Sequence, residues 1–364
     1  MNEEQYRLCL DKIKQQSYPT QDHWNIFSEK YYKKISNFDC MCDFRINGIS
    51  NMLETGLPSQ DREQLIASKD QKYNIDYNEN EIQELKKRFE ELTIMMGDDI
   101  QNIQFNSTVG NPRRFNYIYK NTNYSLNFDD LYHVYATWQL KRLINTITRP
   151  NKVNTVLEIG AGYGNLPHKL KSIFPSVKYT IIDLPEVLLI QHYYLSKNNP
   201  SYKIVNLLDH EELTYGDVNQ IDCDILLIPF SLYHDLQINF DLVINNRSFG
   251  EMSYETLRSY IEWIQNNINP NGFLYTVNRY VFTKSIDQNK IREYPFDNSW
   301  KVIISQPQWL QTHLHEFFIQ RTEDSAIPIN FLLQSFPIST PPCGPIMEKI
   351  QTQSEWIKHQ KVQQ

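Results

Sequence analysis

A short glycine-rich turn after an apolar run constrains the fold of this chain more than any other feature. Residues 155–164 read Thr-Val-Leu-Glu-Ile-Gly-Ala-Gly-Tyr-Gly, and residues 179–185 read Tyr-Thr-Ile-Ile-Asp-Leu-Pro. This pattern predicts a strand, a glycine turn, a helix, and a second strand that ends at an acidic residue, Asp183. α/β proteins build adenosine-binding pockets at such a strand-to-helix turn.

The position of the third glycine separates the adenosine cofactors from one another. A dinucleotide fingerprint reads G-x-G-x-x-G, because the helix N-terminus must approach a pyrophosphate closely. Here the glycines are Gly160, Gly162 and Gly164, Asn165 occupies the slot of the dinucleotide's third glycine, and Glu158 precedes the run. This E-x-G-x-G-x-G pattern resembles motif I of class I S-adenosylmethionine-dependent methyltransferases. The resemblance implies S-adenosyl-L-methionine as the cofactor.

The same resemblance implies a set of cofactor-binding residues. Glycine lets the backbone of the turn come close to a ligand. Asp183, at the end of the second strand, would accept hydrogen bonds from both ribose hydroxyls, and its alternative role is to cap the next helix. Residues at the ends of two later strands complete the set. We expect cofactor contacts from Glu158, Gly160, Ala161, Gly162, Tyr163, Gly164, Asp183, Leu184, Phe230, Ser231, Asn245 and Asn246.

Composition and charge narrow the class of protein. The 364 residues carry a formal net charge of −7, with a pI near 5.8, which argues against a nucleic-acid groove because backbone binding requires clustered Lys and Arg. The cysteines include no C-x-x-C pair, so we expect reduced thiols. The N-terminus does not resemble a signal peptide, and no apolar run is long enough to cross a bilayer. We therefore expect a soluble, cytoplasmic protein with no membrane span.

Periodicity divides the chain into three regions. Residues 1–125 lack strand–helix alternation, and we expect a mainly helical accessory or lid region there. Residues 126–340 are predicted to form the S-adenosylmethionine-binding methyltransferase domain, a Rossmann-like α/β core with a mostly parallel seven-stranded sheet and helices on both faces. Residues 341–364 form a polar tail. A helix over 128–146, capped by Asn127 or Asp129, should precede the first strand.

The third strand of the core has two candidates. Residues 202–208 and 224–229 are both rich in apolar side chains and of strand length. If the later run is the core strand, Phe230 and Ser231 border the adenine. If the earlier run is the core strand, Asp209 takes that role. We favour the later run.

A second polar cluster, residues 245–252, follows the next predicted strand. The carboxyl ends of parallel strands line the crevice in which α/β proteins bind ligands, so Arg247 and Ser248 are candidate substrate-binding residues. A basic turn holds two further candidates, Arg113 and Arg114, because guanidinium groups suit phosphates and carboxylates. A solvated turn explains these two arginines equally well.

Several clusters together look like a family of bacterial sugar O-methyltransferases, over roughly residues 110–317. They are Asp183-Leu184-Pro185-Glu186, the helix at 191–195, the cluster at 245–252, Asn278-Arg279-Tyr280, and residues 294–297 before Trp300. The resemblance implies an enzyme that methylates a hydroxyl of a sugar, or of a sugar-containing precursor of a surface polysaccharide. Its partner would be a small-molecule or glycan substrate.

A base must remove the hydroxyl proton, because a sugar hydroxyl is otherwise a poor nucleophile. Glu251 in the polar cluster and His234 after the candidate third strand are the predicted catalytic residues. Glu251 is alternatively a carboxylate at a helix start. His313 and His315 are further candidates, and a structural role is the more common one for such histidines.

Other functions stay open at this point. A nicotinamide or flavin oxidoreductase is disfavoured by Asn165, whereas a methyltransferase for peptides or other small molecules and a catalytically silent binding protein are both compatible with the sequence. We predict no metal site, because Asn245 and Asn246 stand where carboxylate ligands for magnesium would be needed. A homo-oligomer is also compatible with the sequence.

Overall fold

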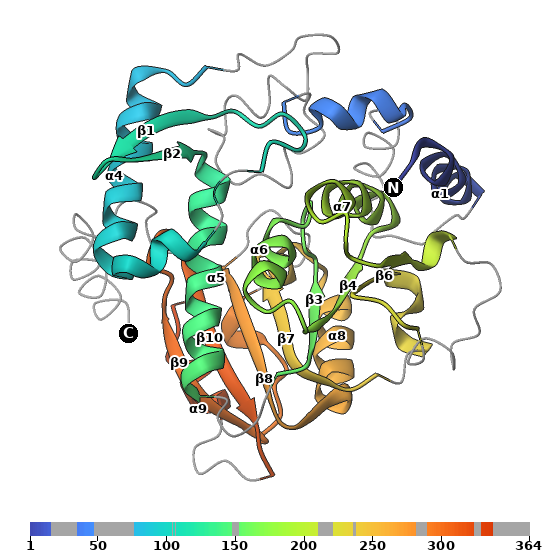
Figure 1. Ribbon diagram of the computed structural model, residues 1–364. Helices are drawn as coiled ribbons and strands as arrows, with labels where there is room; N and C mark the ends of the chain where they lie inside the picture. Colours follow the sequence, from blue (N-terminus) through green and yellow to red (C-terminus); the bar gives the residue numbers. More distant parts are fainter. Residues whose placement is uncertain are drawn as a thin grey trace. The chain divides into compact units, whose positions relative to one another are not determined.

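The computed structural model describes most of the chain (Figure 1). The described residues are 1–15, 35–46, 76–103, 105, 107–147, 153–209, 221–235, 238–281, 290–323 and 329–337. The predicted polar tail lies outside them. Within this part Cys9, Cys40, Cys42 and Cys223 are free thiols.

Eight strands of the described residues form one mixed, mainly parallel sheet in the order β5-β6-β4-β3-β7-β8-β10-β9. The strands are β3 (Thr155–Ile159), β4 (Lys178–Asp183), β5 (Ile204–Asn206), β6 (Ile225–Pro229), β7 (Phe240–Asn246), β8 (Ile268–Arg279), β9 (Trp300–Pro307) and β10 (Leu314–Arg321). β10 is antiparallel to both β8 and β9, whereas β3, β7 and β8 are parallel to one another in turn. The predicted α/β fold with a mostly parallel sheet is confirmed.

Both candidates for the third core strand form strands. The later run is β6, which lies next to β4 and is buried along its whole length, as favoured from the sequence. The earlier run is β5, a short and only partly buried strand at the outer edge. This edge strand is why the sheet has eight strands rather than the predicted seven.

The core helices begin where the sequence places their caps. They are α5 (Phe128–Ile147), α6 (Asn165–Ile173), α7 (Pro185–Asn198) and α8 (Tyr254–Asn267). The Asn127 side chain accepts hydrogen bonds from the N–H groups of Asp129 and Asp130, at 2.9 and 3.3 Å, so Asn127 and not Asp129 caps α5. The Ser253 side chain caps α8 in the same way. α7 starts at Pro185, where the missing N–H costs nothing.

The N-terminal region is helical, as predicted, and it also contains a hairpin. Its main helices are α1 (Glu3–Gln15) and α4 (Glu79–Met96), and its strands are β1 (Phe115–Tyr119) and β2 (Thr122–Leu126). Lys120 and Asn121 connect the strands with φ values of 47° and 64°, the left-handed conformation of a tight hairpin turn. Tyr117 and Tyr119 of β1 pack against Phe89 of α4, and this packing holds the hairpin on the helix.

The chain separates into two compact units. The first unit comprises residues 1–150, 161–179 and 183–233, and the second comprises residues 151–160, 180–182 and 234–364. The division passes between Gly160 and Ala161, inside the glycine run. The domain boundaries expected from the sequence, at residues 125 and 340, stay predictions.

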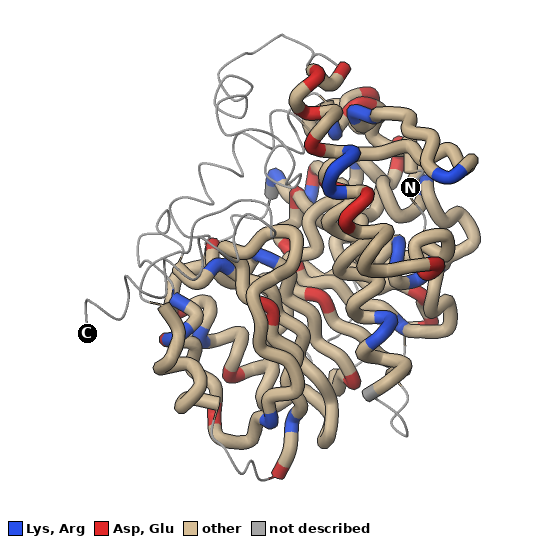
Figure 2. Tube along the Cα trace, turned by 90° about the vertical axis from the view of Figure 1, so that its left-hand side faces the viewer, with Lys and Arg blue, Asp and Glu red and all other residues tan. Residues whose placement is uncertain are grey.

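Acidic and basic residues are interspersed over the described parts of the chain (Figure 2). In those same parts, no helix combines the length and the apolar character needed to cross a lipid bilayer.

Candidate functional site

The strand order reverses direction between β3 and β7. From β3 the sheet continues through β4 and β6, and from β7 it continues through β8. Open α/β sheets bind ligands at the carboxyl ends of the strands at such a reversal. The glycine run follows β3 directly, and the cluster at 245–252 begins at the end of β7. Both clusters identified from the sequence thus begin at the carboxyl ends of these two strands.

The glycine turn needs glycine for its backbone conformation. Gly160, Gly162 and Gly164 have φ values of 74°, 58° and 98°, all in the left-handed region that side chains disfavour. At Gly160 there is also no room for a side chain, because a Cβ atom would collide with the side chain of Ser248 in the same unit. Gly164 caps α6.

Asp183 is fixed against this turn within the first unit. Its Oδ2 accepts hydrogen bonds from the Ala161 N–H at 3.0 Å and from Gln191 Nε2 at 2.7 Å, and its Oδ1 accepts one from the Leu184 N–H at 2.8 Å. Gln191 Nε2 also donates to the Gly162 carbonyl at 2.7 Å. Burial raises the pKa of Asp183 to about 7, and the hydrogen bonds from Leu184, Gln191 and Ala161 offset only part of that rise.

Gln191 is a site residue that the sequence analysis did not single out. It is fully buried in α7, yet its Oε1 has no hydrogen-bond partner. The sequence feature that could have identified Gln191 is its position between apolar residues of a helix that is buried over most of its length. A buried side-chain amide requires hydrogen-bond partners. The Gly162 carbonyl and the Asp183 carboxylate accept hydrogen bonds from Gln191 Nε2.

At the end of β7, in the second unit, the polar side chains bond mainly to one another. Asn245 Nδ2 donates to the Ile159 carbonyl at 3.0 Å and to Ser248 Oγ at 2.6 Å, and its Oδ1 accepts from Asn278 Nδ2 at 2.9 Å. Ser248 Oγ donates to the same Ile159 carbonyl at 2.9 Å. Asn245 is completely buried. These bonds link the ends of β3, β7 and β8, and the contact of Asn245 with the cofactor stays a prediction.

Arg247 lies in this loop with a strained backbone. Its φ of 77° is in the left-handed region, and its N–H donates to the Val277 carbonyl at 2.7 Å. A non-glycine residue pays roughly 1–2 kcal/mol for this conformation. Such strain gathers at functional sites, where a particular side chain has to be presented.

The two arginines of the basic turn differ in their surroundings. Arg113 is buried, donates two hydrogen bonds to the Glu81 carboxylate at 3.1 and 2.9 Å, and stacks over the Tyr77 ring at 4.2 Å. The predicted substrate contact by Arg113 is therefore not supported, because its guanidinium is engaged within the fold. Arg114 is only partly buried and bonds to Ser125 Oγ at 3.2 Å, while its Nε and Nη2 have no hydrogen-bond partner.

The candidate bases also differ in exposure. Glu251 is half-buried at the end of a short 3₁₀ helix, Phe249–Glu251, whereas His234 is exposed and lies 3.4 Å from Ser259 Oγ. His315 is buried between Tyr280 and Ser305, and burial lowers its pKa to about 3. His315 is thus a neutral structural histidine, and His313 is buried as well.

The other predicted cofactor residues fall at strand ends. Glu158 is buried in β3, Leu184 precedes α7, and Phe230 and Ser231 begin the 3₁₀ helix that follows β6. Tyr163 is buried with its hydroxyl bonded to Asp129, so only its backbone is left for a cofactor contact. Asn246 is partly exposed at the end of β7.

Among the described side chains, no group of three or more His, Cys, Asp or Glu residues comes together in a way that could hold a metal ion.

Comparison with known proteins places a methyltransferase domain on this part of the chain. Residues 89–206, about a third of the 364, match a family model described as an O-methyltransferase domain. The match runs from α4 to β5 and includes the glycine turn and Asp183. The chain therefore carries an S-adenosylmethionine-dependent methyltransferase domain. No curated protein matches the chain.

Solved structures resemble the chain only distantly. The mitomycin 7-O-methyltransferase structure shares 13% identity over 53% of this chain and 55% of that one, with a TM-score of 0.37. TehB from Haemophilus influenzae shares 14% over 50% and 61%, with a TM-score of 0.34. A family 2 O-methyltransferase protein from Planctomyces limnophilus, in complex with apigenin, shares 12% over 51% and 58%, with a TM-score of 0.36. The chain spans less than two thirds of each of these structures.

Asp183→Asn should change how stability depends on pH. The pKa of Asp183 is raised on folding from 3.8 to about 7, so its contribution to stability is fully present below pH 3.8 and is lost as the pH rises through 7. Asparagine does not titrate. The free energy of unfolding in urea should therefore shift in favour of the variant between about pH 4 and about pH 7. Equal pH slopes for the two proteins would contradict the raised pKa.

Proposed function

We propose that this chain is an S-adenosylmethionine-dependent O-methyltransferase whose acceptor is a hydroxyl of a sugar or of a sugar-containing polysaccharide precursor. The observation that carries the proposal is the Asp183 carboxylate, fixed at the glycine turn by the Ala161 N–H and Gln191 Nε2. The domain match supports transfer of a methyl group to oxygen. The sequence clusters that resemble sugar O-methyltransferases support the acceptor class.

The residues around the turn fit the adenosine end of the cofactor. Asp183 Oδ1 accepts one hydrogen bond, so it retains a lone pair for a ribose hydroxyl. Gln191 Oε1 is a buried acceptor without a partner, and a cofactor hydroxyl or ammonium would satisfy it. In this proposal the backbone of residues 160–164 binds the amino-acid end. When bound, S-adenosylmethionine supplies an electrophilic methyl group on a sulfonium.

On the acceptor side, we propose Glu251 as the general base. Glu251 is half-buried and lies in the loop, residues 245–252, that Asn245, Ser248 and Asn278 fix through hydrogen bonds. A base held in place can take the hydroxyl proton while the oxygen is aligned for transfer. His234 is exposed, so water competes for its nitrogens, and it is the second candidate. In the second unit, Arg247 is proposed to bind an anionic group of the substrate, and Arg114 of the first unit stays a separate candidate for such a contact.

Purified protein should bind S-adenosylhomocysteine and not NAD in isothermal titration calorimetry. Gly162→Arg should abolish this binding, because the side chain would fill the turn and disfavour its left-handed backbone. Gly97→Arg is the matched control, since Gly97 has a similar φ of 57° but open space around it, and it should leave affinity unchanged. Failure of the wild-type protein to bind S-adenosylhomocysteine would refute the proposed function.

Glu251→Gln should lower turnover by about 10²–10⁴-fold with little change in affinity for S-adenosylhomocysteine, since glutamine keeps the shape but cannot accept the proton. His234→Asn should change turnover far less. The acceptor for this assay comes from a panel of sugars and glycans screened by mass spectrometry for an added methyl group. If the histidine variant shows the larger loss, His234 is the base and the assignment of Glu251 is wrong.

Replacing Arg247 should separate stability from acceptor binding. Arg247→Gly removes the left-handed strain and should keep or raise the free energy of unfolding, by up to roughly 1–2 kcal/mol, while raising KM for an anionic acceptor. Arg247→Ala keeps the strain and should raise KM to the same degree. Urea unfolding and acceptor saturation curves measure the two effects. A glycine variant less stable than the alanine variant would show that the strain is not relieved in this way.

A further inference from the structure

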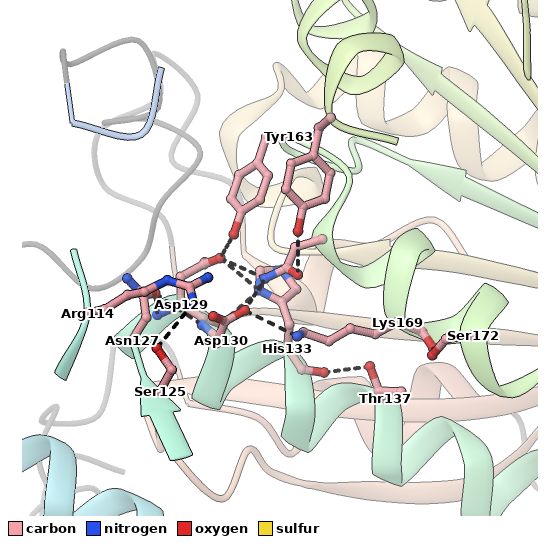
Figure 3. A network of polar contacts seen from close by, with 12 residues as sticks. Arg114, Ser125, Asn127, Asp129, Asp130, His133, Thr137, Tyr163, Lys169 and Ser172 are labelled. Atoms are coloured by element: carbon pink, nitrogen blue, oxygen red, sulfur yellow. Dashed lines mark hydrogen bonds and ion pairs between the residues drawn. The ribbon is translucent and has the colours of Figure 1, made fainter. Parts of the chain in front are cut away.

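A buried polar network joins the glycine turn to the start of α5, within the first unit (Figure 3). Its centre is Asp129, a carboxylate with a side chain only 1% exposed. Asp129 Oδ2 accepts hydrogen bonds from the Tyr163 hydroxyl and from Asn165 Nδ2, the latter at 3.1 Å, and lies 3.2 Å from His133 Nδ1. One carboxylate oxygen therefore fastens the glycine turn to α5.

The two donors from the turn flank Gly164. Tyr163 precedes this glycine and Asn165 follows it, so both bonds restrain the residue whose φ is 98°. Asn165 Nδ2 also reaches Asp130 Oδ1 at 3.2 Å, and its Oδ1 accepts from the Tyr194 hydroxyl at 3.2 Å. The asparagine in the slot of the dinucleotide's third glycine thus has a function of its own: it anchors the end of the turn.

The buried acids of this network are balanced by buried cations. Lys169 Nζ lies 3.2 Å from Asp130, and Arg45 Nη2 lies 4.0 Å from Asp129. The Arg45 guanidinium also lies over the Tyr163 ring, 4.8 Å from its centre. Burial alone would raise the pKa of Asp129, but His133, Arg45 and the Tyr163 hydroxyl outweigh it and hold this pKa well below its usual range.

Arg45 belongs to a segment of the accessory region, residues 35–46, far from the turn in sequence. Hydrogen bonds of Arg45 and packing of Phe44 hold this segment in place. The Arg45 N–H donates to the Gly110 carbonyl at 2.9 Å, and its Nη2 donates to Asn127 Oδ1 at 3.4 Å. Phe44 packs edge-on against Tyr163 with ring centres 5.7 Å apart, and it fills the space that a side chain at Gly110 would need.

We propose that Arg45 is a positioning residue for the methyl-donor site, acting through Asp129 and Tyr163 to hold the glycine turn in its ligand-binding conformation. Together with His133, Arg45 favours the ionised form of Asp129 in a dry environment, and the ionised Asp129 holds Tyr163 and Asn165. The accessory segment then contributes to cofactor affinity without touching the cofactor. This inference rests on the proposed function, because it requires that the turn bind S-adenosylmethionine.

A double-mutant cycle on S-adenosylhomocysteine affinity tests this coupling. Arg45→Met should weaken binding in calorimetry by about tenfold or more, and Tyr163→Phe, which removes only the hydroxyl, should weaken it to a similar degree. Because both act on one network, the double variant should lose much less than the product of the two single losses. Arg45→Lys keeps the charge and should restore part of the affinity. Arg7→Met is the control, since Arg7 is exposed in α1 and pairs with Glu3 in a surface bridge.

The outcomes distinguish this inference from the proposed function. Wild-type protein that does not bind S-adenosylhomocysteine refutes the function itself. Wild-type binding with full affinity retained in Arg45→Met, or with multiplicative losses in the double variant, refutes the positioning role. If Arg45→Met does not fold, hydrogen exchange of residues 161–165 in Tyr163→Phe and Arg45→Lys decides. Faster exchange in both supports the coupling, and unchanged exchange overturns it.

Discussion

The left-handed backbone of the glycine turn is the constraint on which the rest of the site depends, and two carboxylates hold it in the first unit. Asp183 accepts the Ala161 N–H, and Asp129 accepts the Tyr163 hydroxyl and the Asn165 amide. Their electrostatic surroundings are opposite. Asp129 is balanced by Arg45 and His133, which keep its pKa low, whereas the hydrogen-bond donors to Asp183 are neutral and its pKa is raised to about 7. Asp129, whose negative charge is balanced by nearby cations, is suited to a structural role. Among the described residues Asp183 lacks such a cation and would be stabilised by further hydrogen-bond donors, so it is suited to binding a ligand.

The sequence predicted the parts of this site that depend on local spacing. The strand, the glycine turn, the acid at the end of β4 and the caps of α5 and α8 each follow from a few neighbouring residues. The pairing of Arg113 with Glu81 was not predicted, because Glu81 lies on a separate helix, 32 residues earlier, and no local pattern reveals such a pair. The hairpin was missed for a related reason, because its strands are stabilised by aromatic packing against Phe89 of α4.

Polar clusters at strand ends were also harder to interpret than the turn. The sequence correctly placed a polar cluster after β7, but it could not reveal which of its side chains bond to one another. Asn245 donates to Ser248 Oγ and to the Ile159 carbonyl, and Ser248 donates to the same carbonyl, so both residues fix the loop. Arg247 and Glu251 are only half-buried in the same loop, and the proposed function uses these two side chains. Sequence spacing cannot separate these two groups, because both consist of polar residues within one short stretch.

In this proposal, the residues that bind the methyl donor and the residues that bind the methyl acceptor lie in different stretches of the chain. The domain match ends at residue 206, so it contains the glycine turn, Asp129 and Asp183 but not the loop with Arg247 and Glu251. A common methyl donor requires the same geometry in every member of such a domain family, whereas each acceptor requires its own shape and charge. The coupling proposed for Arg45 adds a further consequence. If residues 35–46 stabilise the turn, substitutions in the accessory region alter the affinity for the methyl donor. The sequence of this region then cannot change independently of the core.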